Sequence, residues 1–122
     1  MGISIRWINE AIHGHLVQGD PELEYKGITT DSRSARSGEI FWALPGDRFD
    51  GHHFIRAAGS KGVLGVVIKK GSSPSGIGRN MVVIEVDDTL HALGEFAAQY
   101  RRLHDIPLVA VTGIMAKLQL RR

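Results

Sequence analysis

The sequence contains no cysteine, which excludes disulfides, thiol nucleophiles and thiolate metal sites together. This fits a reducing compartment, and we expect a cytoplasmic protein. No stretch reaches the roughly 18 consecutive apolar residues that a membrane span needs. The N-terminus, MGISIRWINE, also lacks the basic-then-apolar order of a signal peptide. The sequence therefore predicts no membrane partner.

The chain also lacks a strong charge of either sign. Its net charge is +2, and several of its arginines lie near the C-terminus, at Arg101, Arg102, Arg121 and Arg122. Nucleic-acid binding usually requires a concentrated Lys/Arg footprint, which is not found elsewhere in the chain, so we expect no nucleic-acid partner. With 122 residues, 43% of them hydrophobic, we expect one domain, or one domain and the start of a second.

Hydrophobic patterning predicts an α/β fold with a small, mainly parallel sheet flanked by helices. The continuous apolar run at 40–44 is typical of a strand covered on both faces, 63–68 predicts a second buried strand, and 81–86 predicts another strand. Helical spacing predicts helices over 5–12, 52–61 and 89–104. Ser4 is a candidate N-cap for the first of these helices and Gly14 a candidate stop.

Other segments carry weaker signals. The runs 15–17 and 23–25 flank Gln18-Gly19-Asp20-Pro21 and predict a small hairpin, and 28–30 is β-branched and extended. Residues 69–80, rich in Gly, Ser and Lys, predict a mobile surface loop. For the third helix we expect Asp87-Asp88-Thr89 at the N-cap and one face marked by Leu90, Leu93, Ala97 and Tyr100, with Trp7 and Trp42 in the core.

The stretch from Thr29 to Phe54 is the expected ligand site, because it joins a Thr-Asp-Ser-Arg turn, a short apolar strand and a polar loop. Asp31 and Arg33 either take part in the ligand site or form only a structural turn or surface ion pair. Ser32 is either a ligand contact or a turn hydroxyl, Arg48 a phosphate partner or a solvated cation, and Phe49 a cover for a base or a core residue.

Two polar clusters have simpler explanations than catalysis. His52 and His53 are adjacent at a helix start, where their side chains diverge, and no third ligand follows at a matching spacing, so we expect no metal site. Asp87 and Asp88 fit a helix cap better than a general acid/base pair.

Near the C-terminus, an apolar run at 108–111 leads into Thr112 and Gly113, as a phosphate-binding loop begins. A Walker loop then needs a second Gly followed by Lys and Ser/Thr, whereas here Gly113 is followed by Ile114-Met115-Ala116-Lys117. The residues by themselves favour an ordinary buried strand with a tail.

Several motifs together resemble the Mur ligases of peptidoglycan synthesis over nearly all of residues 1–113. They are Thr30-Asp31-Ser32-Arg33, Gly38-Glu39-Ile40-Phe41-Trp42-Ala43-Leu44, Asp50-Gly51-His52-His53-Phe54-Ile55, Val86-Asp87-Asp88-Thr89-Leu90 and Val109-Ala110-Val111-Thr112-Gly113. Within the family, Gly46-Asp47-Arg48-Phe49-Asp50-Gly51 and the long helix leading into Ile106-Pro107 favour the D-alanyl-D-alanine-adding member over the diaminopimelate- or lysine-adding member.

The resemblance implies a domain plan. Residues 1–86 would bind the uridine-diphosphate end of UDP-N-acetylmuramoyl-tripeptide, 87–106 would lead to a central domain, and 107–113 would be the first strand of a missing ATPase domain. By resemblance, the substrate contacts are Thr30, Ser32, Asp47, Arg48 and Phe49, and Thr112 and Gly113 are a remnant of the ATP loop. The family uses ATP and Mg²⁺, but we expect no cofactor, metal or catalytic residue in this chain.

The family continues from such a Thr-Gly into Ser-Asn-Gly-Lys-Thr-Thr-Thr, and this chain departs there. If Ile114 to Arg121 were encoded ATA ATG GCA AAA CTA CAA CTA AGA, regrouping the bases would give Asn-Gly-Lys-Thr-Thr-Thr-Lys. We therefore expect 114–122 to be a frameshifted tail, the alternative being an unrelated natural or engineered C-terminus. A non-catalytic nucleotide-sugar or interaction module is the other functional class that the sequence leaves open.

Overall fold

The computed structural model describes residues 3–46, 48 and 50–104. The elements in chain order are β1 (Ile3–Ser4), α1 (Ile5–Ala11), β2 (His15–Gln18), β3 (Glu24–Tyr25), β4 (Gly27–Thr29), β5 (Glu39–Trp42), the 3-10 helix η1 (Gly51–Phe54), α2 (Ile55–Ser60), β6 (Gly65–Lys69), β7 (Val82–Val86) and α3 (Thr89–His104). The fifth apolar strand expected at 108–111 and the tail at 114–122 lie outside the described residues.

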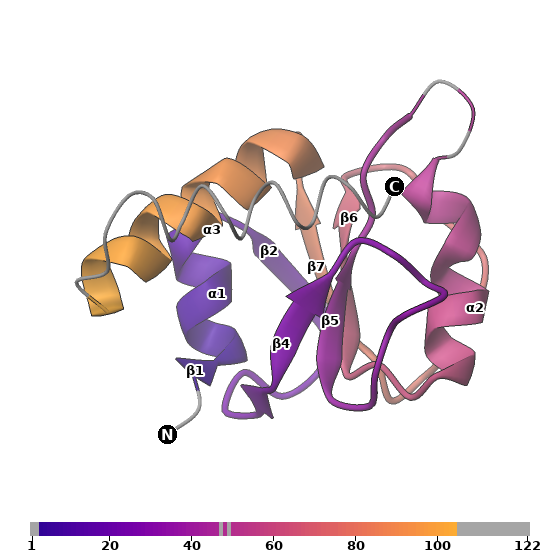
Figure 1. Ribbon diagram of the computed structural model, residues 1–122, viewed down its shortest axis with the longest axis horizontal. Coiled ribbons are helices and arrows are strands. Elements are labelled where there is room, and N and C mark those ends of the chain that lie inside the picture. Colours follow the sequence, from indigo (N-terminus) through magenta and orange to yellow (C-terminus); the bar gives the residue numbers. More distant parts are fainter. Residues whose placement is uncertain (1–2, 47, 49, 105–122) are drawn as a thin grey trace.

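A five-stranded sheet with the order β2-β7-β6-β5-β4 forms the centre of the domain. Strands β4 to β7 are mutually parallel, and β2 pairs antiparallel with β7. Figure 1 shows α1 and α3 on one face of this sheet and α2 on the other. The expected fold, a small and mainly parallel sheet flanked by helices, is confirmed. A separate two-stranded sheet joins β1 to β3.

Alternation along the central strands divides the core into two layers. Ile40 and Trp42 of β5 pack with α1 and α3, whereas Phe41, between them, packs with α2. In the same way Val67 of β6 joins the first layer, and Val66 joins the second. Successive side chains of a strand point to opposite faces, so a continuous apolar run covered on both sides is what this architecture requires.

The layer beneath α3 is centred on Phe96, which is 6% exposed. Its ring lies edge-on to Trp7 at 6.0 Å and to Tyr25 at 6.4 Å, and lies 5.7 Å from both Trp42 and Tyr100. The buried Trp42 also donates its indole N–H to the Thr89 carbonyl at 2.8 Å. These contacts fix the position of α3 over the sheet.

The first helix begins as the sequence predicts and ends slightly differently. The Ser4 hydroxyl accepts a hydrogen bond from the Trp7 amide at 3.3 Å, which confirms the N-cap. After the helix, the residue in the left-handed region is His13 (φ 53°) rather than Gly14. Gly14 serves close packing instead, because a Cβ there would lie 2.5 Å from Cγ2 of Ile84 in β7.

The predicted hairpin at 15–25 is wrong. Both runs are strands, but β2 pairs with β7, and β3 pairs with β1. The turn between them therefore sends the chain from one sheet to the other instead of folding it back on itself. Trp42 is fully buried as expected, while Trp7 is only partly buried against the same core.

The buried face of α3 also differs in part from the expectation. Leu93 and Ala97 are buried, but Leu90 is 43% exposed and Phe96 takes its place in the core. The second predicted helix, 52–61, begins as the 3-10 turn η1 before it becomes α2. Among the described helices, none has the length and apolarity needed to cross a membrane.

Candidate functional site

The parallel strands place four chain segments at one edge of the sheet. Because β4, β5, β6 and β7 run in the same direction, the residues that follow each of them gather at their common carboxyl edge. Ligands of open α/β sheets bind outside this edge. The Thr30–Arg33 turn follows β4, and Arg48 lies on the loop that follows β5, so the described members of the predicted site lie on segments that leave the sheet at the same edge.

Hydrogen bonds from Thr29 and Asp31 define the turn after β4. The Thr29 hydroxyl accepts from the Asp31 amide at 3.1 Å, and Oδ1 of Asp31 accepts from the Arg33 amide at 2.9 Å. Asp31 also pairs with the Arg33 guanidinium at 3.1 Å, and the Arg33 side chain is 80% exposed. The hydrogen bond and charge of this carboxylate raise the pKa of Arg33. The pair therefore forms both a structural turn and a surface ion pair.

Asp31, not Ser32, closes this turn. The Ser32 residue is 7% exposed, and its hydroxyl takes no part in the hydrogen bonds of the turn. The neighbouring Thr30 is half-buried. The turn therefore carries one half-buried and one buried hydroxyl-bearing residue, on a backbone that Thr29 and Asp31 hold in place.

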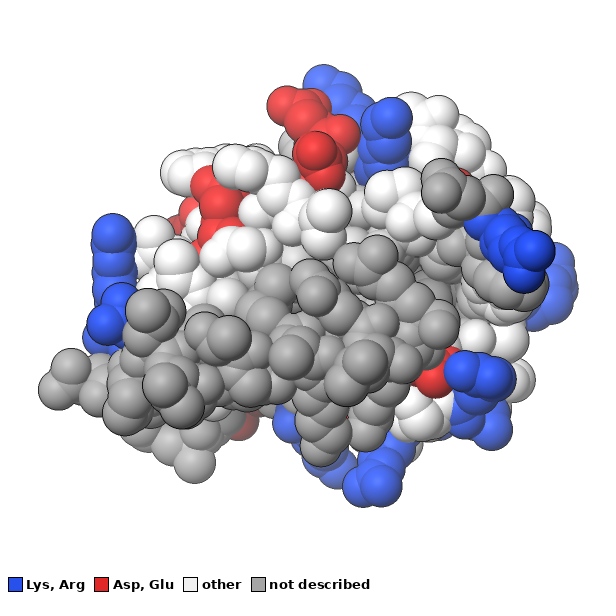
Figure 2. Space-filling view, turned by 45° about the horizontal axis from the view of Figure 1, so that its top comes forward, with Lys and Arg blue, Asp and Glu red and all other residues white. Residues whose placement is uncertain are grey.

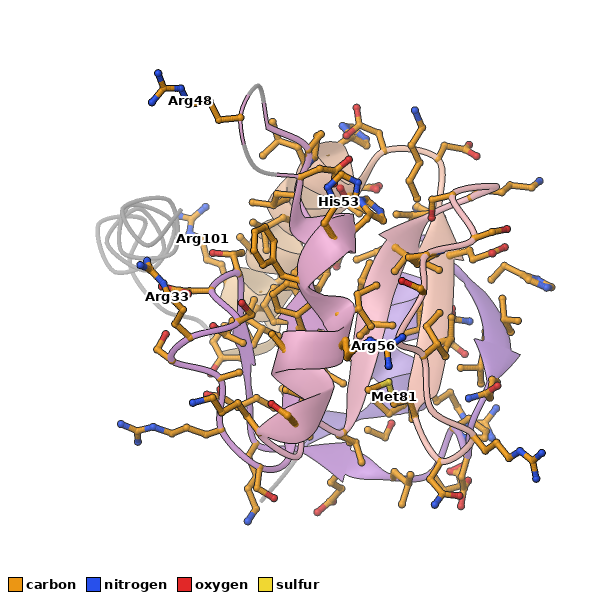
Figure 3. All side chains as sticks on the ribbon, turned by 90° about the vertical axis from the view of Figure 1, so that its right-hand side faces the viewer. Arg33, Arg48, His53, Arg56, Met81 and Arg101 are labelled. Atoms are coloured by element: carbon orange, nitrogen blue, oxygen red, sulfur yellow. The ribbon has the colours of Figure 1, made fainter. Side chains whose placement is uncertain are left out.

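Arg48 lies on the loop after β5 and is exposed. Figure 3 shows its side chain pointing away from the sheet, and Arg33 extends on the same side of the molecule from the turn after β4. The other predicted contacts of this loop, Asp47 and Phe49, lie outside the described residues. So do Thr112 and Gly113, the expected remnant of an ATP loop.

A cavity of about 500 Å³ opens at the ends of β5, β6 and β7. Its lining comes from four segments and consists of Pro45, Asp50, His52, His53, Lys69, Ser72, Pro74, Ser75, Asp87, Asp88 and Thr89. Pro45, Asp50, His52 and His53 lie in the expected ligand stretch, but the sequence interpretation selected none of the lining residues as an individual ligand contact. The signal that would have found them is their position directly after parallel strands or at the helix that follows.

Within this cavity, the ring of His52 contacts two partners. It is 8% exposed, its Nδ1 lies 2.6 Å from Oδ1 of Asp50, and its Nε2 accepts from the Lys69 amide at 2.9 Å. Partial burial raises the pKa of Asp50, but hydrogen bonds from the His52 amide and ring, and the charges of His52 and His53, outweigh burial and lower it. His53 is exposed, so the two adjacent histidines diverge as predicted.

The acidic residues at the start of α3 form a helix cap. Oδ1 of Asp88 accepts from the amides of Leu90 at 3.0 Å and His91 at 3.1 Å, as the sequence predicts. In the part of the chain that the structure describes, no group of three or more His, Cys, Asp or Glu side chains is placed to hold a metal ion. In Figure 2 the Lys and Arg side chains are spread around the margin of the face shown.

The fold is that of an α/β domain whose candidate site lies at the carboxyl edge of parallel strands. Residues 24–101 match the family model described as Mur ligase family, catalytic domain. The match covers more than half of the chain, and the chain belongs to the Mur ligase family.

Individual relatives include two kinds of ligase. The chain is 38% identical over 96 residues to the UDP-N-acetylmuramoyl-tripeptide–D-alanyl-D-alanine ligase of Synechocystis. The aligned region covers 79% of this chain and 21% of that ligase. It is 37% identical over 101 residues to the UDP-N-acetylmuramoyl-L-alanyl-D-glutamate–2,6-diaminopimelate ligase of Geobacter metallireducens, with 81% and 19% covered. The chain therefore spans about a fifth of the length of these relatives.

A solved structure of MurF from Acinetobacter baumannii superposes with a TM-score of 0.71 and 32% identity, covering 84% of this chain and 22% of that chain. A MurF ligase from Thermotoga maritima, solved in complex with ADP, superposes with a TM-score of 0.52 and 25% identity over 62% of this chain and 17% of that chain. The fold thus matches the same family that the sequence matches.

Proposed function

We propose that this chain is the UDP-substrate-binding domain of a cytoplasmic, ATP-dependent ligase that adds D-alanyl-D-alanine to UDP-N-acetylmuramoyl-tripeptide. The observation that supports this most is that Thr30, Ser32 and Arg48 lie on segments that follow the neighbouring parallel strands β4 and β5, in a chain that belongs to the Mur ligase family. In this proposal residues 1–86 bind substrate and 87–106 lead toward a catalytic domain.

The chemistry of the three described residues suits the proposed ligand. Uracil and ribose require hydrogen-bond donors and acceptors, which the Thr30 and Ser32 hydroxyls supply, and a diphosphate pairs well with a guanidinium. Asp47 and Phe49 remain proposed contacts on the same loop as Arg48. The acidic cavity at the ends of β5 to β7 suits a dianionic diphosphate less well, which is why we place the phosphates toward Arg48.

Titration of the labelled chain with UDP-N-acetylmuramoyl-tripeptide, UDP and UTP tests the proposal. We expect amide shifts at Thr30, Ser32 and 47–49. Ser32→Ala should weaken binding up to about tenfold, the cost of one hydrogen bond, whereas Ser37→Ala, at an exposed serine after the same turn, should bind as the unaltered chain does. Shifts that avoid the carboxyl edge, or equal effects of the two variants, would contradict the proposed site.

A second candidate, a diaminopimelate-adding ligase, is favoured by relatives that match at similar identity. The names of the two groups of relatives give different acceptors, a UDP-N-acetylmuramoyl-tripeptide and a UDP-N-acetylmuramoyl-L-alanyl-D-glutamate. Comparing the affinity of the chain for these two compounds separates the candidates. Preference for the tripeptide supports D-alanyl-D-alanine addition, and preference for the dipeptide supports the alternative.

ATP and Mg²⁺ belong to the proposed function of the whole ligase, but the residues present here do not fit an ATP loop. After Thr112 and Gly113 the chain has no Gly-Lys-Thr sequence with which to hold phosphates. We propose that the 122-residue chain neither hydrolyses ATP nor forms the amide, and a phosphate-release assay measures this. Reading the gene downstream of Gly113 tests the proposed frameshift, which is refuted if codons 115–120 cannot be regrouped into the loop.

A further inference from the structure

One side chain of β5 holds α3 at two places. The indole N–H of Trp42 donates to the carbonyl of Thr89, the first residue of α3, at 2.8 Å. The Trp42 ring also packs against Phe96, with 5.7 Å between the ring centres. Because Thr89 and Phe96 are about two helical turns apart, they lie on the same face of α3. Trp42 therefore fixes both the start of the helix and its rotation about its own axis.

The hydrogen bond from Trp42 is shielded from water. Trp42 is 0% exposed and Thr89 is 2% exposed. An indole N–H can only donate, and a buried donor needs a partner. If the start of α3 moved away from β5, the N–H of Trp42 would lose its acceptor inside the core. The contact therefore favours a single position of the helix over the sheet.

The start of α3 is also part of the wall of the cavity at the carboxyl edge. Asp87, Asp88 and Thr89 line that cavity. The Asp88 carboxylate caps the helix, and Trp42 reaches the same turn from the side of the sheet. The first turn of α3 therefore belongs both to the candidate site and to the helix, and Trp42 sets its position relative to the strands.

The other end of α3 lies well away from this edge. The helix has 16 residues and is therefore about 24 Å long. Figure 1 shows it crossing the face of the sheet that α1 also covers. Over this length, a tilt of about 5° at the start moves the last turn by about 2 Å. A change at Trp42 should thus be most visible near Leu103, which is 52% exposed.

We propose that Trp42 is a positioning residue that sets the direction in which α3 leaves the substrate-binding edge. This role rests on the proposed function, in which 87–106 lead from the substrate domain toward a catalytic domain. Joining two substrates requires their reacting atoms to be placed to within about 1 Å, so the direction of such a helix affects the rate. Trp42 is fully buried and acts through Thr89 and Phe96, without touching the ligand.

Spin labels measure the direction of α3. Because the chain has no cysteine, labels can be attached through Leu103→Cys in α3 and Val17→Cys in β2, at two side chains that are more than half exposed. With Trp42 present we expect one narrow distribution of label distances. Trp42→Phe keeps an aromatic ring but removes the N–H donor, and should widen the distribution or shift its mean by about 2 Å. Trp7→Phe, at the other tryptophan that contacts Phe96, is the matched control and should leave it unchanged.

A second control separates positioning from a general loosening of the core. Ile40→Val removes one methyl group from the same strand and the same layer, at a residue that is 0% exposed, and leaves the indole bond in place. It should lower the urea midpoint without widening the distances. Equal widening in Ile40→Val or Trp7→Phe would overturn the proposal.

Hydrogen exchange of the indole N–H groups replaces the label experiment if Trp42→Phe fails to fold. The Trp42 indole of the unaltered chain should exchange at least about tenfold more slowly than the indole of the partly buried Trp7. Equal exchange rates would show that Trp42 does not hold Thr89, and would overturn the proposal.

The outcomes separate this proposal from the proposed function. The label distances are measured without ligand, so an unchanged distribution in Trp42→Phe refutes the role of Trp42 and leaves substrate binding intact. If UDP-N-acetylmuramoyl-tripeptide shifts no amide of the unaltered chain, the proposed function fails, and the role that rests on it fails too. In Trp42→Phe the shifts at Thr30 and Ser32 should persist. Their loss would mean that Trp42 supports the binding site itself, which would overturn the role assigned to α3.

Discussion

Replacing Phe96 with alanine should destabilise the domain strongly. Phe96 is 6% exposed, and four aromatic rings lie within 6.4 Å of its centre. Removing a buried Phe costs about 3–5 kcal/mol, and the lost aromatic pairs place this site toward the upper end. Because domains of this size are stable by only about 5–15 kcal/mol, the variant should fold but keep a much smaller margin.

Urea unfolding monitored by tryptophan fluorescence measures this loss, since Trp7 and Trp42 both contact Phe96. A loss of about 4 kcal/mol shifts the midpoint by roughly 2 M urea. Leu90→Ala, on the same helix but 43% exposed, is the control and should cost less than about 0.5 kcal/mol. Similar midpoints for the two variants would refute the packing of α3 through Phe96.

Three further predictions follow from the backbone and the charges. Gly94→Ala should raise stability by about 0.5–1 kcal/mol in thermal unfolding, because Gly94 is exposed inside α3 and its Cβ would meet nothing within 4 Å; a loss would contradict the open surface. Gly51→Ala should cost about 1–3 kcal/mol, since its Cβ would meet the Leu44 nitrogen at 2.7 Å, and an unchanged urea midpoint would show that the loop base can move. The folded-state pKa of Asp50 is lowered, so its stabilisation is present above the unfolded pKa of about 4 and is lost as the pH falls through the folded value. Asp50→Asn should therefore be less stable than the unaltered chain near neutral pH and equally stable at strongly acid pH, and a difference that does not depend on pH would refute this reading.

Local pattern predicted the elements well because most of them are defined by their own residues. The apolar run at 40–44 required a strand covered on both faces, and Ser4 and Asp88 act as the caps that their side chains allow. The pairing of the strands was harder to predict from the sequence. The residues of β2 and β3 gave no sign that one joins β7 and the other β1, since pairing is decided by packing between segments far apart in the chain.

The candidate site also has a part that the sequence indicated and a part that it did not. Thr30, Ser32 and Arg48 were selected by resemblance to the Mur ligases, and their contact with substrate stays a prediction. The bridge from Asp50 through His52 to Lys69 could not be predicted, because it depends on where β6 ends relative to η1. Leu90 shows how far helical spacing can predict a buried face. The spacing in α3 fits more than one face, and packing against the sheet buries the face that carries Phe96 and leaves Leu90 exposed.

The antiparallel pairing of β2 with β7 has a consequence for how the chain is made. During synthesis β2 emerges early, but its partner follows only after β4, β5, α2 and β6 have been translated. Until then β2 is an unpaired edge, and Val17, 51% exposed even in the folded domain, adds an apolar side chain to it. Nascent chains that stop before β7 should therefore be the ones that associate with chaperones or with each other.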